Sequence, residues 1–264
     1  MKYRIGSALF LAAALLLSAA GCGGTALKQD RHLTAETCTD ERPFLFEEDG
    51  APAGFEADLL RLLAARAGYT AELRRTSRDS LFAHLQRGYV DLALSGAALM
   101  PEEARSYRYS SPYFLGRPAI LTADPSIASA GDLRDKITAV VPASPGQFAL
   151  EARFGRNAPQ IRKTAAAADA LLSGETDALV GDMTYLQFLC REYPDRAFRI
   201  VEDARAFPPE RFVILYPKNG DPDVRRALGQ ALSSLIADGT YAALYRKWFG
   251  EEPPPALRDA VYGK

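Results

Sequence analysis

The chain has 264 residues, with 32 Lys and Arg against 33 Asp and Glu, so its formal net charge is −1. This balance excludes the strongly basic surface that binds nucleic acid or anionic membranes. Hydrophobic residues make up 48% of the sequence, which is enough for a packed core and excludes general disorder.

The N-terminus predicts export and lipid attachment. Lys2 and Arg4 precede an apolar run over about residues 5–20, which is shorter than the ~20 residues of a membrane span. Small residues then stand directly before Cys22, in an arrangement similar to a bacterial lipobox. We therefore expect residues 1–21 to be a lipoprotein signal peptide and Cys22 to carry the lipid that anchors the protein outside the cytoplasm. An ordinary signal peptide followed by an incidental cysteine is the alternative.

The remaining cysteines and the histidines predict no metal site and no cofactor. Cys38 and Cys190 are too far apart in sequence to define a disulfide, although one is permitted outside the cytoplasm. The two histidines, His32 and His84, do not combine with cysteines in any zinc-binding spacing. We interpret His84 as a packed or surface residue of a helix.

The first part of the folded chain alternates helices and strands. After a flexible tether over residues 22–31, apolar residues with helical spacing predict a helix that begins at Phe55 and stops at Gly68. A second helix is predicted over residues 80–86. The apolar run over residues 91–95 predicts a short strand that is buried on both faces.

A weak internal repeat links the two halves of the chain. Residues 88–96 resemble residues 174–182: in each, a Gly ends a helix, an Asp follows three residues later, and an apolar strand comes next. We interpret Asp91 and Asp177 as turn or capping residues at the amino ends of these strands. One supersecondary unit used twice predicts two similar α/β lobes.

The carboxyl ends of the two repeated strands are the first candidates for ligand contacts, because ligands of open α/β sheets bind there. Ser95 and Gly96 end the first strand, and Gly181 and Asp182 end the second. Ser95, Gly96 and Asp182 are therefore candidate binding residues.

Two helices are predicted near the C-terminus. Apolar residues share one face over residues 224–235, and an aromatic face continues over residues 241–248 after a break at Asp238-Gly239. We expect both faces to belong to the core. The Pro253-Pro-Pro255 run should end regular structure and leave residues 253–264 as a tail.

Three blocks of the sequence carry a resemblance to a known family. They are Arg42-Pro-Phe-Leu-Phe46 with Asp49-Gly50 and Gly54-Phe55-Glu-Ala-Asp-Leu59, then Gly88-Tyr-Val-Asp91 through Ser110-Ser-Pro-Tyr-Phe114, and last Asp238-Gly-Thr-Tyr241 with Lys247-Trp-Phe-Gly250. In order and spacing these blocks are similar to the signature of the family 3 bacterial extracellular solute-binding proteins, the polar amino acid receptors of ABC importers. The resemblance extends over about residues 33–250.

The resemblance implies an α/β protein with the two-lobed, type II fold of periplasmic binding proteins. In this fold each lobe is a mixed β-sheet flanked by helices, and two hinge strands cross between the lobes. Residues 32–116 with 208–252 would form the first lobe, and residues 117–207 the second. Such proteins close around a small polar solute and deliver it to an ABC permease. We expect a monomer, since the receptor must open, close and dock.

The resemblance also implies where the solute binds. Family members that bind an amino acid hold its carboxylate with an Arg of the first lobe and its ammonium with an Asp of the second lobe. Asp182 matches that Asp. The Arg position falls on Glu103, within Met100-Pro-Glu-Glu103, although a slip in register would bring Arg105 there.

Other matched positions also depart from the family. Two aromatic residues that stack on the ligand in relatives are matched by Glu41 and Arg78. The Gly-Thr-Thr turn that helps to hold the ligand carboxylate falls near Ser144-Pro-Gly146, so Ser144 and Gly146 are candidate contacts.

Two ligand classes stay open. A solute without a carboxylate, such as an amine, would be complemented by Asp182, Glu103 and Glu41, because an unpaired buried carboxylate is costly. An amino acid would instead require Arg78 or Arg105 as a new carboxylate clamp. A third interpretation makes Glu103 a solvent-facing acid in the first turn of a helix.

Two other functions also stay open. A dehydratase on the same fold would need a positioned acid in the cleft, for which Glu103 or Asp182 would serve. No Ser-His-Asp, Cys-His or metal set is present in the sequence, so we predict that the protein is not an enzyme. A receptor that presents its ligand to a membrane sensor would use the same closure as a transport protein.

Overall fold

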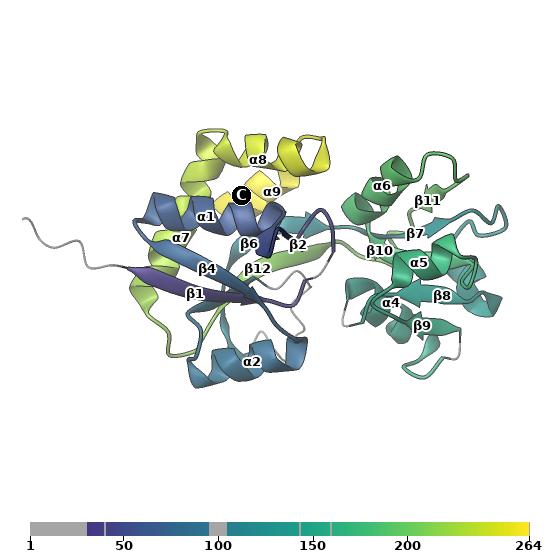
Figure 1. Ribbon diagram of the computed structural model, residues 1–264, viewed down its shortest axis with the longest axis horizontal. Coiled ribbons are helices and arrows are strands. Elements are labelled where there is room, and N and C mark those ends of the chain that lie inside the picture. Colours follow the sequence, from purple (N-terminus) through teal and green to yellow (C-terminus); the bar gives the residue numbers. More distant parts are fainter. Residues whose placement is uncertain (1–30, 40, 95–104, 143, 159, 264) are drawn as a thin grey trace, which may run out of the picture.

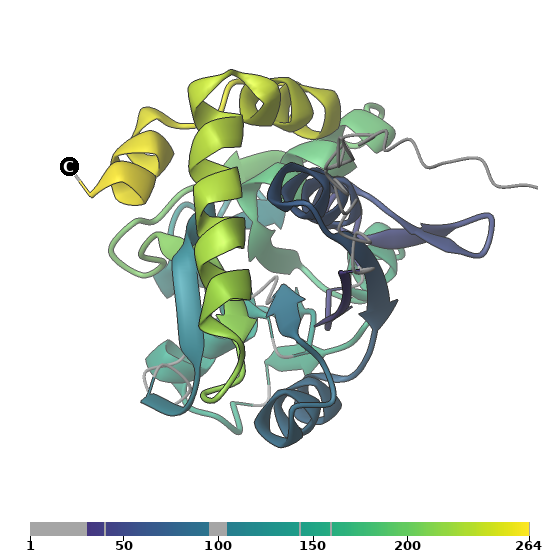
Figure 2. The ribbon, with the colours of Figure 1, turned by 90° about the vertical axis from the view of Figure 1, so that its left-hand side faces the viewer.

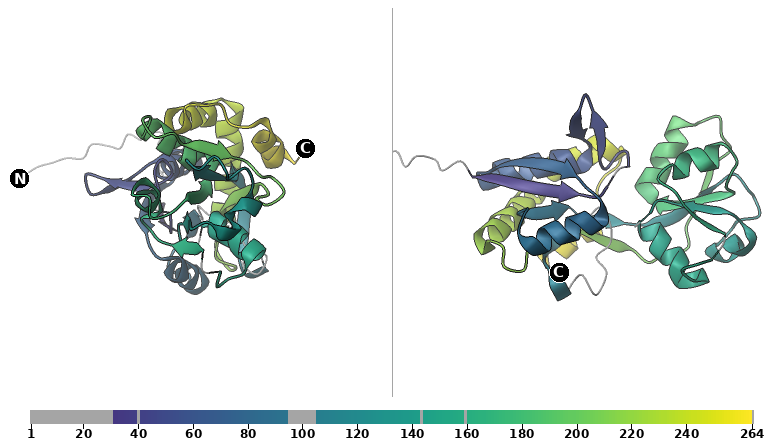
Figure 3. Two further views of the ribbon diagram at one scale, coloured as in Figure 1. Left: turned by 90° about the vertical axis from the view of Figure 1, so that its right-hand side faces the viewer. Right: turned by 60° about the horizontal axis from the view of Figure 1, so that its bottom comes forward.

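The computed structural model describes residues 31–39, 41–94, 105–142, 144–158 and 160–263. These residues form two α/β lobes that lie side by side and are joined by crossing strands (Figures 1 and 3). The prediction of a two-lobed α/β fold with mixed sheets is therefore confirmed. Within the described residues, no helix is long and apolar enough to cross a membrane.

The first lobe is built around a five-stranded sheet. Its strands are β1 (His32–Thr37), β4 (Thr70–Arg75), β5 (Leu92–Leu94), β6 (Arg108–Gly116) and β12 (Glu210–Tyr216). They lie in the order β4-β1-β5-β12-β6, in which β12 alone runs antiparallel to both of its neighbours. A small hairpin, β2 (Phe46–Glu48) and β3 (Ala51–Ala53), stands beside it.

Helices cover both faces of this sheet. They are α1 (Phe55–Ala67), α2 (Arg78–Arg87), α7 (Pro222–Ala237), α8 (Thr240–Phe249) and α9 (Pro255–Tyr262). In Figure 1, α1 and α8 lie above the sheet and α2 lies below it. Figure 2 shows α7 running across the sheet and α9 beside it.

The second lobe repeats the same arrangement. Its elements are β7 (Pro118–Thr122), the 3-10 helix η1 (Ala130–Asp135), β8 (Thr138–Val140), α4 (Pro145–Phe154), β9 (Ile161–Lys163), α5 (Ala167–Leu172), β10 (Ala178–Asp182), α6 (Met183–Glu192) and β11 (Arg199–Val201). The sheet order is β9-β8-β10-β7-β11, with β7 antiparallel to both neighbours. The two sheets correspond position by position: β9, β8, β10, β7 and β11 take the places of β4, β1, β5, β12 and β6.

The internal repeat seen in the sequence corresponds to this duplicated unit. The Asp91 carboxylate accepts a hydrogen bond from Thr34 N at 2.8 Å, and Asp177 accepts one from Ile137 N, also at 2.8 Å. Each Asp also donates its own backbone N–H to the same partner. Both Asp residues therefore tie the start of one parallel strand to its neighbour, and their interpretation as turn or capping residues is confirmed.

Both sheets are buried on two sides, as the apolar strand runs predict. In β5, Leu92 and Leu94 pack against the α1 and α7 side, and Ala93 packs against the α2 side. In β10, Val180 joins the core beside α4, and Leu179 joins the core beside α5 and α6. Alternate side chains of one strand thus enter two separate cores.

An aromatic cluster around Phe55 organises the first lobe. Phe55 is fully buried, and its ring centroid lies within 4.9–6.5 Å of six other aromatic ring centroids. Burial of each such side chain contributes about 1.5–3 kcal/mol to folding. Helix α1 begins at Phe55, directly after Gly54. Gly54 has a φ of +118°, which favours glycine, and a Cβ added there would lie 2.5 Å from Phe44 O.

The predicted helices are found close to their expected positions. α1 ends at Gly68 in the left-handed conformation, and α2 ends at Gly88 in the same way. The buried residues of the two C-terminal helices lie on the predicted faces. His84 bonds to the buried Glu36 through Nδ1, at 2.9 Å from each carboxylate oxygen, so it is a packed residue. Cys38 and Cys190 do not form a disulfide.

The expectation that regular structure ends at the proline run is wrong. Pro255 is the first residue of α9, a position where the missing N–H of proline costs no hydrogen bond. The helix buries Leu257 against the core, and Tyr262 donates a hydrogen bond to Ser233 O at 2.9 Å. The last residues are therefore docked on α7.

Candidate functional site

A pocket of about 300 Å³ lies between the two lobes. It is formed where parallel strands of both sheets end, since its lining residues follow β1 and β4 in the first lobe and β8, β9 and β10 in the second. The hinge strand β12 contributes Phe212 to the wall. The described lining residues are Cys38, Thr39, Glu41, Phe44, Thr76, Ser77, Arg78, Val141, Pro142, Ser144, Gly146, Ala165, Val180, Gly181, Asp182 and Phe212.

The first-lobe wall carries the cation of the pocket, Arg78. This residue is the first of α2, after the capping residue Ser77, whose hydroxyl accepts from Ser80 N. Its guanidinium carbon lies 4.9 Å from the ring centroid of Phe82 in the same helix, and 5.6 Å from that of Phe148 in α4. Arg78 therefore reaches across the pocket to the second lobe.

A neutral thiol and a carboxylate also belong to the first-lobe wall. Burial raises the pKa of the Cys38 thiol, and Arg78 only partly opposes that effect, so the thiol stays protonated at neutral pH. Glu41 follows β1 on the same wall. Burial raises the pKa of Tyr185 in α6, and the negative charge of Glu41 raises it further. The Glu41 carboxylate therefore lies near the second lobe.

The second-lobe wall contains the N-terminus of α4. Ser144 caps this helix, and its hydroxyl accepts from Gln147 N at 3.2 Å. A Cβ added at Gly146 would lie 2.6 Å from Val180 O, so only glycine lets the start of α4 pack this closely on β10. The positive end of the helix dipole therefore faces the pocket, where it favours an anionic group.

Asp182 is the carboxylate that the second lobe contributes to the pocket. Its Oδ1 accepts hydrogen bonds from the backbone N–H of Thr184 at 2.9 Å and from the Thr184 hydroxyl at 2.6 Å. Its Oδ2 accepts from Arg117 N at 2.7 Å. These three donors favour the charged form, yet burial outweighs them and raises the pKa of Asp182. The residue is thus both the N-cap of α6 and part of the pocket wall.

Five of the candidate residues from the sequence meet in this pocket: Glu41, Arg78, Ser144, Gly146 and Asp182. Ser95, Gly96 and Glu103 lie outside the described residues. Arg105 is described and exposed, and it is not one of the described residues that line the pocket.

Sequence reasoning missed several neighbours of the site. Phe44 and Phe212 form apolar walls of the pocket and were not among the candidate residues from the sequence. Beneath the wall, Glu56 is fully buried and accepts hydrogen bonds from Tyr113 Oη at 2.5 Å and Thr37 Oγ1 at 3.1 Å. A Glu among apolar residues in the first turn of a helix was the signal that could have found it.

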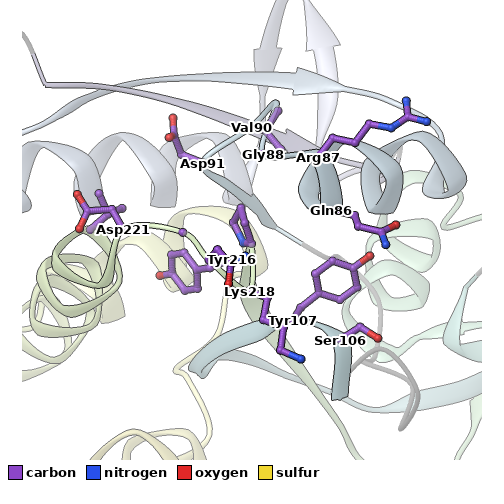
Figure 4. Close-up of a pocket in the computed structure, with 14 residues that line it drawn as sticks. Gln86, Arg87, Gly88, Val90, Asp91, Ser106, Tyr107, Tyr216, Lys218 and Asp221 are labelled. Atoms are coloured by element: carbon purple, nitrogen blue, oxygen red, sulfur yellow. The ribbon is translucent and has the colours of Figure 1, made fainter.

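A larger cavity of about 610 Å³ lies in the first lobe at the strand ends away from the second lobe, before β5 and after β12 (Figure 4). Its described lining residues, which include Asp91, Tyr107 and Lys218, all belong to the first lobe. Closure of one lobe on the other would not enclose a ligand there. Within the part of the chain that the structure describes, no group of three or more His, Cys, Asp or Glu residues is placed to hold a metal ion.

Two α/β lobes, two crossings of the chain and a charged pocket between the lobes define a type II periplasmic binding protein. The sequence pattern of the bacterial extracellular solute-binding proteins, family 3, matches residues 33–251, and the chain belongs to this family. The resemblance stated from the sequence is therefore confirmed, as is the interpretation of the protein as the extracytoplasmic solute-binding component of an importer.

Three similar proteins illustrate the relationship. The amino-acid-binding protein AabA of Dichelobacter nodosus is 30% identical over 209 residues, which are 77% of this chain and 81% of AabA. The arginine-binding extracellular protein ArtP of Bacillus subtilis strain 168 is 25% identical over 252 residues, 92% of this chain and 97% of ArtP. The crystal structure of the arginine-, lysine-, histidine-binding protein ArtJ from Geobacillus stearothermophilus has a TM-score of 0.78 at 32% identity, and covers 88% of this chain and all of ArtJ.

Proposed function

We propose that the protein captures an amino acid with a positively charged side chain and delivers it to an ABC permease. The observation that carries this proposal is the charge arrangement of the interlobe pocket. Its described charged residues are Arg78, Glu41 and Asp182. One cation and two carboxylates complement a ligand that carries one carboxylate and two cationic groups.

The placement of these charges supports a specific orientation of the ligand. Arg78 and the N-terminus of α4 form the end that favours the ligand carboxylate. Asp182 would take the α-ammonium, and Glu41 would take the side-chain cation. Because Arg78 lies in the pocket and Arg105 is not among its described lining residues, Arg78 is the better candidate for the clamp that the Glu103 position lacks.

Relatives support the same ligand class. ArtP is named an arginine-binding protein, and ArtJ binds arginine, lysine and histidine. The interlobe pocket has charged residues, Glu41 and Arg78, at the positions where the resemblance to the family implies stacking aromatic residues. The ligand would therefore be held chiefly by ion pairs, and only Phe44 and Phe212 offer aromatic surface among the described lining residues.

We also infer that the protein acts as a monomer and does no chemistry on its solute. Asp182, the described residue that a dehydratase would use as its acid, already accepts three hydrogen bonds. Such a residue is positioned to hold a cation and not to transfer a proton to a substrate. A pocket that must open and close between two lobes of one chain is complete without a second copy.

A binding panel tests this function. Arginine, lysine, histidine, glutamine, glutamate, agmatine and putrescine would be added to protein that begins at residue 23, and melting temperature and calorimetric Kd would be measured. We expect arginine or lysine to stabilise the protein by about 2.7 kcal/mol at a hundred times its Kd. Agmatine, which lacks only the carboxylate of arginine, should bind more weakly. Stabilisation by none of these solutes, or by putrescine alone, would contradict the proposal.

Lipid attachment is the second part of the proposal. Cys22 follows an apolar segment and small residues in the lipobox-like pattern, and we propose that it is acylated after removal of residues 1–21. In a bacterial host the full chain should partition into the detergent phase of a Triton X-114 extract. The Cys22→Ser variant should move to the aqueous phase. Equal partitioning of the two proteins would contradict lipid attachment at Cys22.

A further inference from the structure

A second acidic residue, Glu210, stands beside Asp182 at the hinge. Glu210 is the first residue of β12 and pairs with Gly116, the last residue of β6. The chain crosses to the second lobe directly after Gly116, at Arg117 between β6 and β7. Asp182 pairs with Pro118 on the other side of this crossing. The two carboxylates therefore flank one residue of the hinge.

Both carboxylates lie on the face of the hinge that leads to the pocket. Glu210 and Phe212 are two residues apart in β12 and point to the same side, and Phe212 lines the pocket. A Cβ added at Gly116 would lie 2.9 Å from the Phe212 ring and 3.1 Å from Asp182 Oδ2. Gly116 thus leaves the space in which these side chains meet.

The Glu210 carboxylate has no compensating partner at one of its oxygens. Its Oε2 is buried and accepts no hydrogen bond from the described residues. Burial, followed by the charge of Asp182, raises the pKa of Glu210 to about 8. A carboxylate in this position is costly to ionise until a cation arrives.

The other charged groups around the pair do not supply that cation. Arg117 lowers the pKa of Asp182 only as the last of several causes, and its half-exposed guanidinium lies 3.8 Å from Glu202. On α8, the phenol of Tyr245 lies near Asp182 and Glu251, and burial raises its pKa, so it stays neutral. The hinge therefore holds two carboxylates and no paired cation among the described groups.

We propose that Glu210 acts with Asp182 to make the hinge end of the pocket select the α-ammonium group of the solute. Glu210 is a positioning residue, because it acts through the electric field at Asp182 and does not line the pocket itself. This inference rests on the proposed capture of an amino acid.

Selection of a cation at this pair has a measurable consequence, which is release of a proton. At pH 7 a carboxyl group with a pKa of about 8 is protonated in about nine molecules of ten. A bound ammonium favours the ionised form, so the Glu210 proton leaves to solvent when the solute binds. Affinity then rises with pH until the free protein also loses the proton, near pH 8.

Calorimetry with arginine tests the proposal. The number of protons released at pH 7 is measured in two buffers that differ in ionisation enthalpy, and Kd is measured from pH 6 to pH 8. Wild-type protein should release between about 0.5 and 0.9 proton at pH 7, which corresponds to binding about 7-fold to 50-fold more tightly at pH 8 than at pH 6. The Glu210→Gln variant should release almost no proton, and its Kd should change less than about twofold between pH 6 and pH 8.

Glu202→Gln is the matched control, because Glu202 is a nearby carboxylate that is 63% exposed. The Glu202→Gln variant should release as many protons on binding arginine as the wild-type protein does. Wild-type binding without proton release, or equal release by wild type and Glu210→Gln, would overturn the role of Glu210 and leave the proposed function standing. Failure of arginine and the rest of the panel to bind at any pH would instead refute the proposed function.

Discussion

The Asp182→Asn variant is expected to bind arginine at least about 30-fold more weakly than the wild-type protein. Loss of one member of a buried, hydrogen-bonded charge pair costs about 2–5 kcal/mol of binding free energy, and 1.4 kcal/mol corresponds to tenfold in Kd. Asparagine caps helices as well as aspartate does, so its carbonyl can still accept from Thr184 N. Calorimetric titration of the two proteins at pH 8 gives the comparison.

The stability of the free protein separates a binding role from a structural one. Burial raises the pKa of Asp182, so the ionised carboxylate destabilises the folded state once the pH exceeds the pKa of the unfolded chain. Asp182→Asn gives up the bond from Arg117 N but also removes this buried charge, so it should unfold at a temperature equal to or above that of wild type at pH 8. A residue that costs stability in the free protein and is required for binding serves the ligand.

Asp221→Asn is the matched control for this prediction. Asp221 is the N-cap of α7 and accepts a hydrogen bond from Asp223 N at 2.8 Å. Asp182 makes the same kind of capping bond with Thr184 N, also two residues ahead in the chain. It lies outside the interlobe pocket. The control should leave the Kd for arginine within about twofold, because a cap acts on the helix alone. Unchanged binding by Asp182→Asn would mean that Asp182 only caps α6.

Much of the fold could be predicted because its signals are local. Apolar residues at helical spacing and a glycine in the left-handed conformation fix where α1 begins and ends, from Phe55 to Gly68. The repeat around Asp91 and Asp177 is also local, since each Asp ties its own strand to the neighbouring one. Such features need no knowledge of how the lobes lie. The helix after Pro253 was missed because a proline run marks a helix start as well as a helix end.

The interlobe contacts could not be predicted because they depend on the placement of one lobe against the other. Arg78 was a candidate by alignment, but its contact with Phe148 joins residues of different lobes. Glu210 gave no signal in the sequence, because a Glu before an apolar strand is ordinary. Its burial follows from pairing with Gly116 and from the neighbouring Asp182, which are separated from it by many residues.

Arg78 itself departs from a local rule in a way that points to function. It is the first residue of α2, where the helix dipole disfavours a cation by about 0.3–1 kcal/mol. The Arg78 side chain instead packs against Phe82 and Phe148 in the interlobe pocket. Local rules are broken most often at functional sites, and a planar guanidinium fits the two oxygens of a carboxylate.

The Arg78→Met variant should therefore lose affinity for arginine by about 30-fold or more, while its Kd for agmatine stays within about threefold of wild type. The difference isolates the ligand carboxylate, because arginine and agmatine share every other group, and loss of a buried charge partner costs about 2–5 kcal/mol. Both ligands would be titrated into wild type and variant in a double-mutant cycle.

Two further arginines decide what the result means. Arg87→Met changes the last residue of the same helix, where the guanidinium carbon also lies over an aromatic ring, 5.9 Å from the Tyr89 centroid. It should leave both affinities unchanged, because Arg87 is outside the interlobe pocket. If Arg105→Met abolished arginine binding and Arg78→Met did not, the carboxylate clamp would belong to Arg105. Equal losses for arginine and agmatine in Arg78→Met would show that Arg78 supports the pocket without touching the carboxylate, and the solute class would then return to amines.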